Sequence, residues 1–184
     1  MAVAALERTR ERSETMPDRL EGLFDAHHER LHRLAQRLSR DAEGARDLVQ
    51  ETFLRAARRV DSVPEGRSGE EAWLVRVLVN LCRDQRRRQR VRGRLEALPD
   101  DHPDGASSPE QSAVARATVR QALAQLSPRR RAVVVMHELE EKSVEEIARL
   151  LGIARVTVRW HLAAARRHLA EILRGQGTTR TRTS

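Results

Sequence analysis

The sequence predicts an all-α protein made of two small helical domains that are joined by a flexible acidic linker. Apolar residues recur at steps of three and four through most of the chain, which is the helical period, and no stretch alternates as a half-buried strand would. The segment LEALPDDHPDGASSPEQS at 95–112 holds five acidic residues and three of the six prolines, without Lys or Arg. Such a composition is typical of a solvated linker.

The first domain is expected over residues 18–94. Before it, residues 1–17 are polar and are predicted to be a disordered tail, in which Met16 is an alternative start. The helical periodicity predicts helices over about 20–39, 42–60 and 71–92. Pro64, Gly66 and Gly69 predict a loop over 61–70, because each of these residues disfavours a helix interior.

The second domain is expected over residues 113–174, followed by a disordered tail over 175–184. Its first helix is predicted over 113–126, and Ser127 with Pro128 has the pattern of an N-cap and a first helical residue. Ser143 and Glu146 have the spacing of a capping box. The segment EEIARLLGIARVTVRWHLAAARRHL at 145–169 reads as two amphipathic helices about Gly152, which is the pattern of a helix-turn-helix.

The composition points to a polyanionic partner. Lys and Arg number 35 against 27 acidic residues, which gives a net charge of +8, and only Lys142 is a lysine. A basic chain of this kind is most simply a nucleic-acid binder. Cys82 is the only cysteine, so neither an intramolecular disulfide nor a cysteine-based zinc site is expected. Without an apolar run of membrane-spanning length or a signal peptide, we expect a cytoplasmic protein with no membrane insertion.

Two helices carry basic faces. On the second helix of the helix-turn-helix, Val158, Leu162, Ala165 and Leu169 form the buried seam, which leaves a basic arc for the major groove. The candidate DNA-binding residues there are Arg155, Arg159, Trp160 and Arg166. On the helix predicted over 71–92 the basic side suits a phosphate backbone. Its candidate residues are Trp73, Arg76, Asn80, Arg83 and Arg87. For both tryptophans, partial burial is an equally good interpretation.

The helix predicted over 42–60 has a different outward face. Opposite its apolar seam, a leucine lies among acidic and amide side chains, which is a plausible but weak signal for a protein-binding patch. The residues of this patch are Asp47, Gln50, Glu51, Leu54 and Arg58.

The sequence does not favour an enzyme or a cofactor site. It has no Gly-rich phosphate loop, no G-x-S-x-G motif and no nucleophile beside a base. His28 and His32 stand four residues apart, as metal ligands on a helix could, and His161 and His168 form a poorer pair. Because no third ligand is near in the sequence, surface or capping roles are the better interpretation, and we expect no metal.

Three segments resemble bacterial sigma factors, especially the small extracytoplasmic-function (ECF) group. SRDAEGARDLVQETFLRAARRV resembles the helix that binds core polymerase, and EAWLVRVLVNLCRDQRRRQR is similar to the sigma helix that follows it. LSPRRRAVVVMHELEEKSVEEIARLLGIARVTVRWHLAAARRHL resembles the C-terminal promoter-reading domain. The chain is therefore identified as a member of this family over about residues 18–174, with sigma region 2 preceding region 4.

The resemblance implies a promoter-specificity factor without enzymatic activity of its own. Its partners would be core RNA polymerase (the beta and beta-prime subunits), promoter DNA and an anti-sigma factor, and it would associate with the nucleoid when active. By resemblance, the outward face of 44–60 docks on the polymerase clamp helices, the face of 71–92 engages the minus-ten element, and the recognition helix reads the minus-thirty-five element. Residues 159–164 depart from the common family pattern, so no promoter sequence is implied.

Two alternative functions and one hypothesis about regulation remain open from the sequence. The chain could be a stand-alone helix-turn-helix regulator that binds DNA without polymerase, although no sensor domain or dimerisation helix is evident. It could also be a degenerate sigma that titrates other factors, although both basic faces are intact. Finally, Cys82 is a candidate redox trigger, at the margin of a buried seam.

Overall fold

A computed structural model describes the backbone of residues 2–39, 41–92, 119 and 121–180, and the side chains of 18–39, 41–89, 119 and 121–172. The first half contains α1 (Ala2–Leu38), α2 (Ala42–Arg58), the 3-10 turn η1 (Val60–Ser62) and α3 (Arg67–Arg92). The second half contains α5 (Pro128–Val134), the π-helical turn η2 (Val135–Leu139), α6 (Val144–Leu151) and α7 (Arg155–Arg180). Across these described ranges there is no strand, so the all-α prediction is confirmed.

The helices extend beyond the prediction at both ends of the chain. α1 begins at Ala2 instead of near residue 20, and α7 continues to Arg180, into the region expected to be a tail. Residues 2–15 are rich in Ala, Leu, Glu and Arg, which are strong helix formers, and this explains the longer α1. The linker predicted over 95–112 lies outside the described residues, as do residues 113–118 and 120 of the helix predicted over 113–126; residues 121–125 of that helix are helical as predicted.

α3 also begins earlier than the sequence suggested, at Arg67. Gly69 was expected to break a helix, but it lies in the first turn of α3. A β-carbon at Gly69 would lie 2.9 Å from Cβ of Pro64, closer than real side chains approach. The glycine is therefore explained by the close approach of the preceding loop, not by an irregular backbone.

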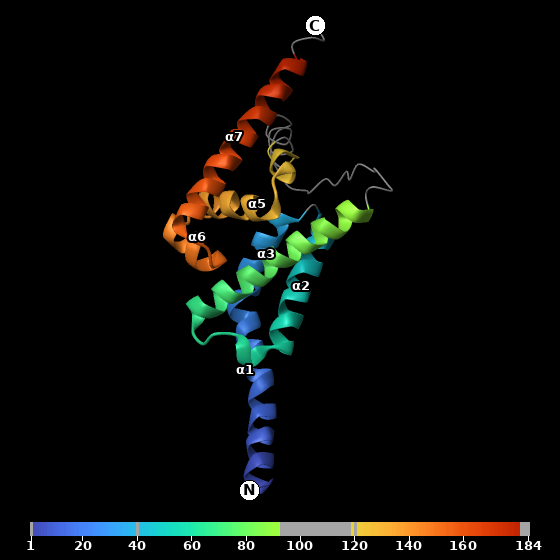
Figure 1. Cartoon of the computed structure of the whole chain (residues 1–184). Coiled ribbons are helices and arrows are strands. Elements are labelled where there is room, and N and C mark those ends of the chain that lie inside the picture. The colour runs from blue at the N-terminus through green and yellow to red at the C-terminus, as the bar shows by residue number, and fades with distance from the viewer. Residues whose placement is uncertain (1, 40, 93–118, 120, 181–184) are drawn as a thin grey trace.

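The N-terminal domain is a bundle of α1, α2 and α3, with α3 lying obliquely across the other two (Figure 1). α2 begins at Asp41, whose carboxylate accepts a 2.6 Å hydrogen bond from the Gly44 amide. The apolar seams of the helices meet in a core that includes Leu34, Leu48 and Leu74, all at most 4% exposed. Burial of such leucines contributes roughly 1.5–3 kcal/mol each.

The C-terminal domain is built on the predicted helix-turn-helix. Ser143 caps α6 as expected: its hydroxyl accepts from the Glu146 amide at 3.2 Å, and its own amide donates to the Glu146 carboxylate at 2.8 Å. Gly152 ends α6 with φ +64°, in the left-handed region. Glycine is favoured there because it has no β-carbon penalty. The turn directs Val158 and Leu162 of α7 into the core beneath α6.

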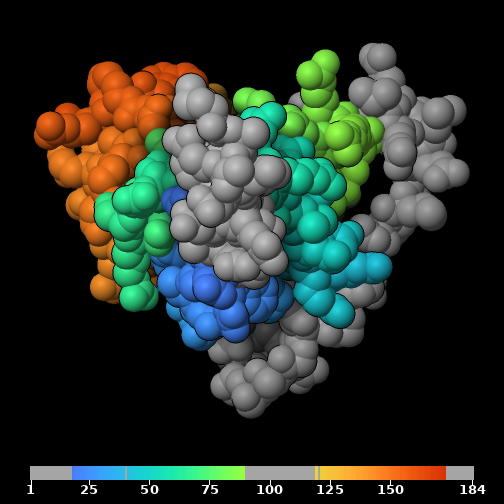
Figure 2. Space-filling model, turned by 90° about the horizontal axis from the view of Figure 1, so that it is seen from below, coloured from blue at the N-terminus to red at the C-terminus, as the bar shows by residue number. Residues whose placement is uncertain are grey.

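The two domains pack directly against each other, which the sequence did not predict. Buried residues of both domains, among them Leu78 and Ile147, belong to one continuous apolar cluster. α3 contacts both α5 and α6. Seen from below, the orange C-terminal domain lies on the opposite side of the molecule from the teal α2 (Figure 2). On the outward face of α2, Asp47, Gln50, Leu54 and Arg58 are exposed.

Candidate nucleic-acid and protein interfaces

An apolar groove of about 480 Å³ lies between α1 and α2. Two of its side chains are large, apolar and exposed: Phe24 of α1 at 44% and Leu54 of α2 at 42%. The groove is lined from α1 by Leu20, Phe24, His28 and His32, and from α2 by Arg46, Val49, Gln50, Phe53, Leu54 and Ala57. An exposed apolar hollow with polar side chains around it is typical of a protein-binding site.

Stacked rings form the α1 side of this groove. Phe24 stacks on His28 with ring centroids 4.4 Å apart, and it contacts Phe53 of α2 at 5.0 Å. His28 in turn stacks on His32 at 5.9 Å. The pair of histidines that the sequence offered as candidate metal ligands is therefore part of an aromatic row. Of the side chains that the structure describes, no three metal-binding groups come together.

Of the predicted protein-binding residues of α2, two line the groove. Gln50 and Leu54 line it, and Asp47 and Arg58 are exposed on the same helix. Glu51 is half-buried and pairs with Arg55 at 3.1 Å, one turn away. The sequence analysis missed the α1 half of the site, although Leu20, Phe24, His28 and His32 recur every four residues and so share one helix face.

The C-terminal domain covers one part of the basic face of α3 and leaves the other part exposed. Arg83 and Arg87 are exposed, whereas Trp73, Arg76 and Asn80 are half-buried. Arg76 lies beneath the helix-turn-helix: a β-carbon at Gly152 would lie 3.2 Å from both Cδ and Nη1 of Arg76. The predicted DNA-binding residues of α3 are therefore on one helix, but they are not equally accessible.

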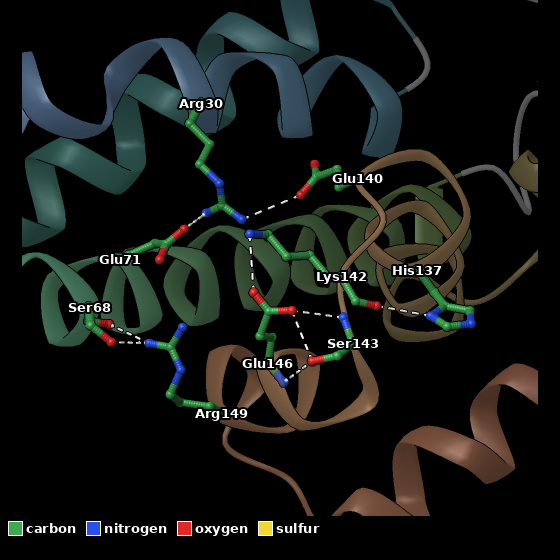
Figure 3. A network of polar contacts seen from close by, with 9 residues as sticks. All are labelled: Arg30, Ser68, Glu71, His137, Glu140, Lys142, Ser143, Glu146 and Arg149. Carbon is green, nitrogen blue, oxygen red and sulfur yellow. Dashed lines mark hydrogen bonds and ion pairs between the residues drawn. The ribbon is translucent and has the colours of Figure 1, made fainter.

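Arg149 of α6 adds a second contact to the same part of α3. Its guanidinium donates to the Ser68 carbonyl at 3.2 Å and also to the Ser68 hydroxyl. Figure 3 shows this contact beside the capping box of α6. The helix-turn-helix is thus held over the beginning of α3, where the chain enters the predicted minus-ten face.

Glu140, directly after η2, joins the domains from the other side. Its carboxylate lies 3.4 Å from Arg30 and 3.6 Å from Arg37, both on α1. Arg30 also pairs with Glu71 of α3 (Figure 3). Because the Glu140 side chain is only 13% exposed, these pairs are less screened than ordinary surface ion pairs.

Arg131 of α5 is the most buried link between the domains, at 5% exposure. Its guanidinium donates to the Leu38 carbonyl at the end of α1 at 2.6 Å. It also donates to the carbonyls of Leu123 and Ala124, each at 2.8 Å. A planar guanidinium with five donors can serve three carbonyls at once. Arg131 therefore satisfies backbone groups of both domains.

Cys82 lies at this interdomain seam. It is 7% exposed and lines a small cavity with Leu38, Pro128 and Arg131. Burial raises the pKa of its thiol, although Arg131 and Arg86 oppose that shift. A buried thiol with a raised pKa is less reactive than an exposed one at neutral pH.

The face of α7 opposite its buried seam is exposed. Val158, Leu162 and Ala165 are buried as predicted. The exposed face includes Arg155, Val156, Arg159, Trp160, Ala163, Arg166 and Arg167. Trp160 is 54% exposed, and the guanidinium of Arg130, from α5, lies 5.0 Å from its ring centroid. Such a cation–π contact restricts the orientation of the indole.

Two of the predicted DNA-binding arginines of α7 are paired with carboxylates. Arg166 contacts Glu138 at 2.7 Å, and Arg155 contacts Glu145 at 3.4 Å. The hydrogen bond from Arg166 is the main cause of the lowered pKa of Glu138. Arg155 lies one turn before the adjacent residues Arg159 and Trp160, whereas Arg166 is about 10 Å further along the helix axis than Arg159.

Comparison with known families accounts for both domains. Residues 23–92 match sigma-70 region 2, and residues 116–169 match sigma-70 region 4. ECF RNA polymerase sigma factor SigL of Mycobacterium tuberculosis is 36% identical over 163 residues, which cover 88% of this chain and 92% of SigL. The chain belongs to the ECF RNA polymerase sigma factors.

Other members of this family differ in length and organism. ECF sigma factor SigE of Mycolicibacterium smegmatis is 40% identical over 157 residues, which cover 82% of this chain but only 60% of SigE. Among solved structures, the sigma factor RpoE in complex with the anti-sigma factor NepR from Bartonella quintana has 25% identity and a TM-score of 0.55. That match covers 91% of this sigma factor and 97% of the RpoE chain.

The architecture of the ECF family explains the order of the helices in this sigma factor. The three-helix bundle corresponds to region 2, and the helix-turn-helix to region 4. None of the helices within the described ranges is both long and apolar enough to span a membrane.

Proposed function

We propose that this sigma factor binds core RNA polymerase (the beta and beta-prime subunits) and docks on the polymerase clamp helices through the groove between α1 and α2. The exposed Phe24 and Leu54 supply apolar contact area. The predicted polar residues Asp47, Gln50, Glu51 and Arg58 would surround it. Apolar centres with polar rims are the usual anatomy of protein interfaces. The presence of regions 2 and 4 in one chain carries this proposal.

In the resulting holoenzyme, α3 would engage the minus-ten element and α7 the minus-thirty-five element. Trp73, Arg76, Asn80, Arg83 and Arg87 are the proposed contacts of α3, and Arg155, Arg159, Trp160 and Arg166 those of α7. The net charge of +8 suits a phosphate backbone. The chain itself would supply binding and positioning, and polymerase the chemistry.

Simultaneous contact with both promoter elements requires the two domains to separate. The elements lie about 25 base pairs apart, which is about 85 Å of B-DNA at 3.4 Å per base pair. In the closed arrangement, however, Arg76 of the minus-ten face lies against Gly152 of the helix-turn-helix. We therefore infer that polymerase binding opens the seam that Arg131, Glu140 and Arg149 hold closed.

An anti-sigma factor is the proposed regulatory partner. The similar RpoE chain was solved in complex with the anti-sigma factor NepR, and the fold of this sigma factor matches that chain over most of its length. The active protein would be cytoplasmic and associated with the nucleoid.

The decisive experiment is reconstitution with purified core RNA polymerase on a fragmented genomic template. Promoter-specific transcripts that appear only when the sigma factor is added would support the proposal, and their start sites would define both promoter elements. A footprint on duplex DNA from the chain alone, without a stable complex with core, would instead favour the stand-alone regulator.

A further inference from the structure

The exposed face of α7 carries an apolar pair that phosphate binding does not explain. Val156 is 70% exposed and Trp160 is 54% exposed. They lie four residues apart, so they are neighbours on one helix face. Two of the other exposed large hydrophobic side chains, Phe24 and Leu54, line the groove on region 2, whereas Val119 and Leu139 are single exposed residues outside α7. Val156 and Trp160 on α7 therefore require a different binding partner.

The charges around this pair favour DNA over a protein. Arg155 and Arg159 are exposed beside it on α7, and Arg130 stacks on Trp160 from α5. The lowered pKa of His161 has burial as its main cause, with the charges of Arg129 and Arg130 as further causes. A concentration of arginines around two apolar side chains is complementary to a polyanion with apolar groups on its base edges.

Only one of the four bases presents an apolar group in the major groove. Among the base edges exposed there, thymine alone carries an apolar substituent, its C5-methyl group. In a helix-turn-helix, residues near the start of the recognition helix contact base edges. Val156 and Trp160 lie in the first two turns of α7. Their position and their chemistry therefore agree.

We propose that Val156 and Trp160 read thymine methyl groups in the minus-thirty-five element, with Arg130 as a positioning residue for the Trp160 ring. This inference rests on the proposed function, because it assigns specificity to the region 4 surface of a promoter-binding protein. It predicts thymine at one or more positions of that element. It also gives the apolar pair a different role from that of the arginines, which would contact phosphates and guanine edges.

The test exchanges thymine for deoxyuridine, which lacks only the methyl group and keeps the same base pairing. On the strongest promoter recovered by reconstitution, each thymine of the minus-thirty-five element is replaced in turn, and holoenzyme affinity is measured by competition. Burial of one methyl-sized group corresponds to about a four-fold preference for thymine over uracil. Because the ratio compares two DNAs with one protein, partial loss of folding or of phosphate contacts cancels.

Variants assign the preference to residues. V156A and W160A should each bring the thymine-to-uracil ratio toward one at the position they contact. R130Q should reduce it at the Trp160 position, and R130K should do the same, because lysine keeps the charge but not the planar stacking group. L139A is the matched control: Leu139 is a similarly exposed aliphatic side chain of the same domain, outside α7, and it should keep the wild-type ratio.

The outcomes separate this inference from the proposed function. Absence of sigma-dependent transcripts would overturn the proposed function itself. Specific transcripts with a wild-type ratio near one at every thymine, or an element without thymine, would overturn the methyl-reading inference alone. So would V156A and W160A holoenzymes that keep the wild-type ratio but bind core polymerase more weakly, since the pair would then contact a protein.

Discussion

Arg76 on the basic face of α3 lies directly beneath Gly152, the residue that turns the chain between the two helices of the helix-turn-helix. One contact thus joins a proposed minus-ten residue to the element that positions the proposed minus-thirty-five reader. In this arrangement the face of α7 opposite its buried seam is exposed, while Arg76 is half-buried. We therefore infer that the closed chain presents its two proposed DNA surfaces unequally.

Replacing Gly152 by alanine is expected to destabilise region 4 and to loosen this contact. At φ +64° a β-carbon is strained, and it would also displace the Arg76 side chain. The expected loss is about 1 kcal/mol of unfolding free energy, measured by urea denaturation. Gly22 is the matched control, since a β-carbon there meets nothing within 4 Å. G22A should be stabilising by about 0.5–1 kcal/mol, and equal effects of the two substitutions would contradict this account.

Arg131→Lys is expected to weaken the seam between the domains. A lysine ammonium cannot reach the three carbonyls that the guanidinium serves, so buried acceptors would lose their donor. We expect a loss of about 2–3 kcal/mol in urea denaturation. Cys82 lines the adjoining cavity, so its reaction with a thiol reagent at pH 8 should become faster. R129K, at the neighbouring half-buried position, should change stability by less than about 0.5 kcal/mol.

The same arginine shows what the sequence could not reveal. Arg129, Arg130 and Arg131 are consecutive in SPRRRAVV, and nothing local distinguishes them. In the folded chain Arg130 stacks on Trp160, whereas Arg131 is buried at the seam. The helix-turn-helix was predictable because its signals are local: the capping box, the glycine turn and the apolar period. The seam depends on contacts between residues as distant as Leu38 and Arg131.

The groove on region 2 was predicted only in part, for a related reason. The outward face of α2 could be drawn from one helix, and Leu54 is exposed as expected. The α1 half required knowing that Phe24 and Phe53 meet, with ring centroids 5.0 Å apart. A stripe at four-residue spacing indicates a helix face, but it does not say which neighbouring helix shares that face.

Leu54→Asp is expected to abolish binding to core polymerase without unfolding the chain. Leu54 is exposed at the groove, so a charge there should cost little stability but should disrupt an apolar contact. Loss of a central apolar contact corresponds to about a thirty-fold or greater weakening, measured by size-exclusion or titration against core. L139D, on an exposed leucine outside the groove, is the control. Equal weakening by both variants would show that charge alone, not the groove, is responsible.

Glu138→Gln is expected to strengthen the holoenzyme–promoter complex. The Glu138 carboxylate holds Arg166 at 2.7 Å, so its removal frees a guanidinium for phosphate and removes a negative charge beside DNA. One added phosphate contact would steepen the dependence of log K on log salt by about 0.9. The measurement is competition binding of holoenzyme to promoter DNA at several salt concentrations between about 50 and 200 mM, which gives the slope of log K against log salt. Weaker binding would instead assign Glu138 a role in orienting Arg166 toward its base or phosphate.

The capping box of α6 gives a prediction for acid stability. Hydrogen bonds from the Ser143 amide and hydroxyl lower the pKa of Glu146 from 4.5 to about 2. Because the folded pKa lies below the unfolded value, the stabilisation is fully present above pH 4.5 and is lost as the pH falls toward about 2. In urea denaturation, E146Q should flatten this part of the pH profile.

Serine substitutions separate the capping box from a general effect of helix starts. S143A should lower the unfolding free energy by about 1 kcal/mol at neutral pH, since an N-cap acceptor is lost. Ser127 occupies the corresponding position of α5 but makes no side-chain capping bond, so S127A should have a smaller effect. Combining S143A with E146Q should cost less than the sum of the two, because the residues act through shared hydrogen bonds. Additive losses would show that the two side chains stabilise α6 independently, the serine as a cap and the carboxylate through the helix dipole.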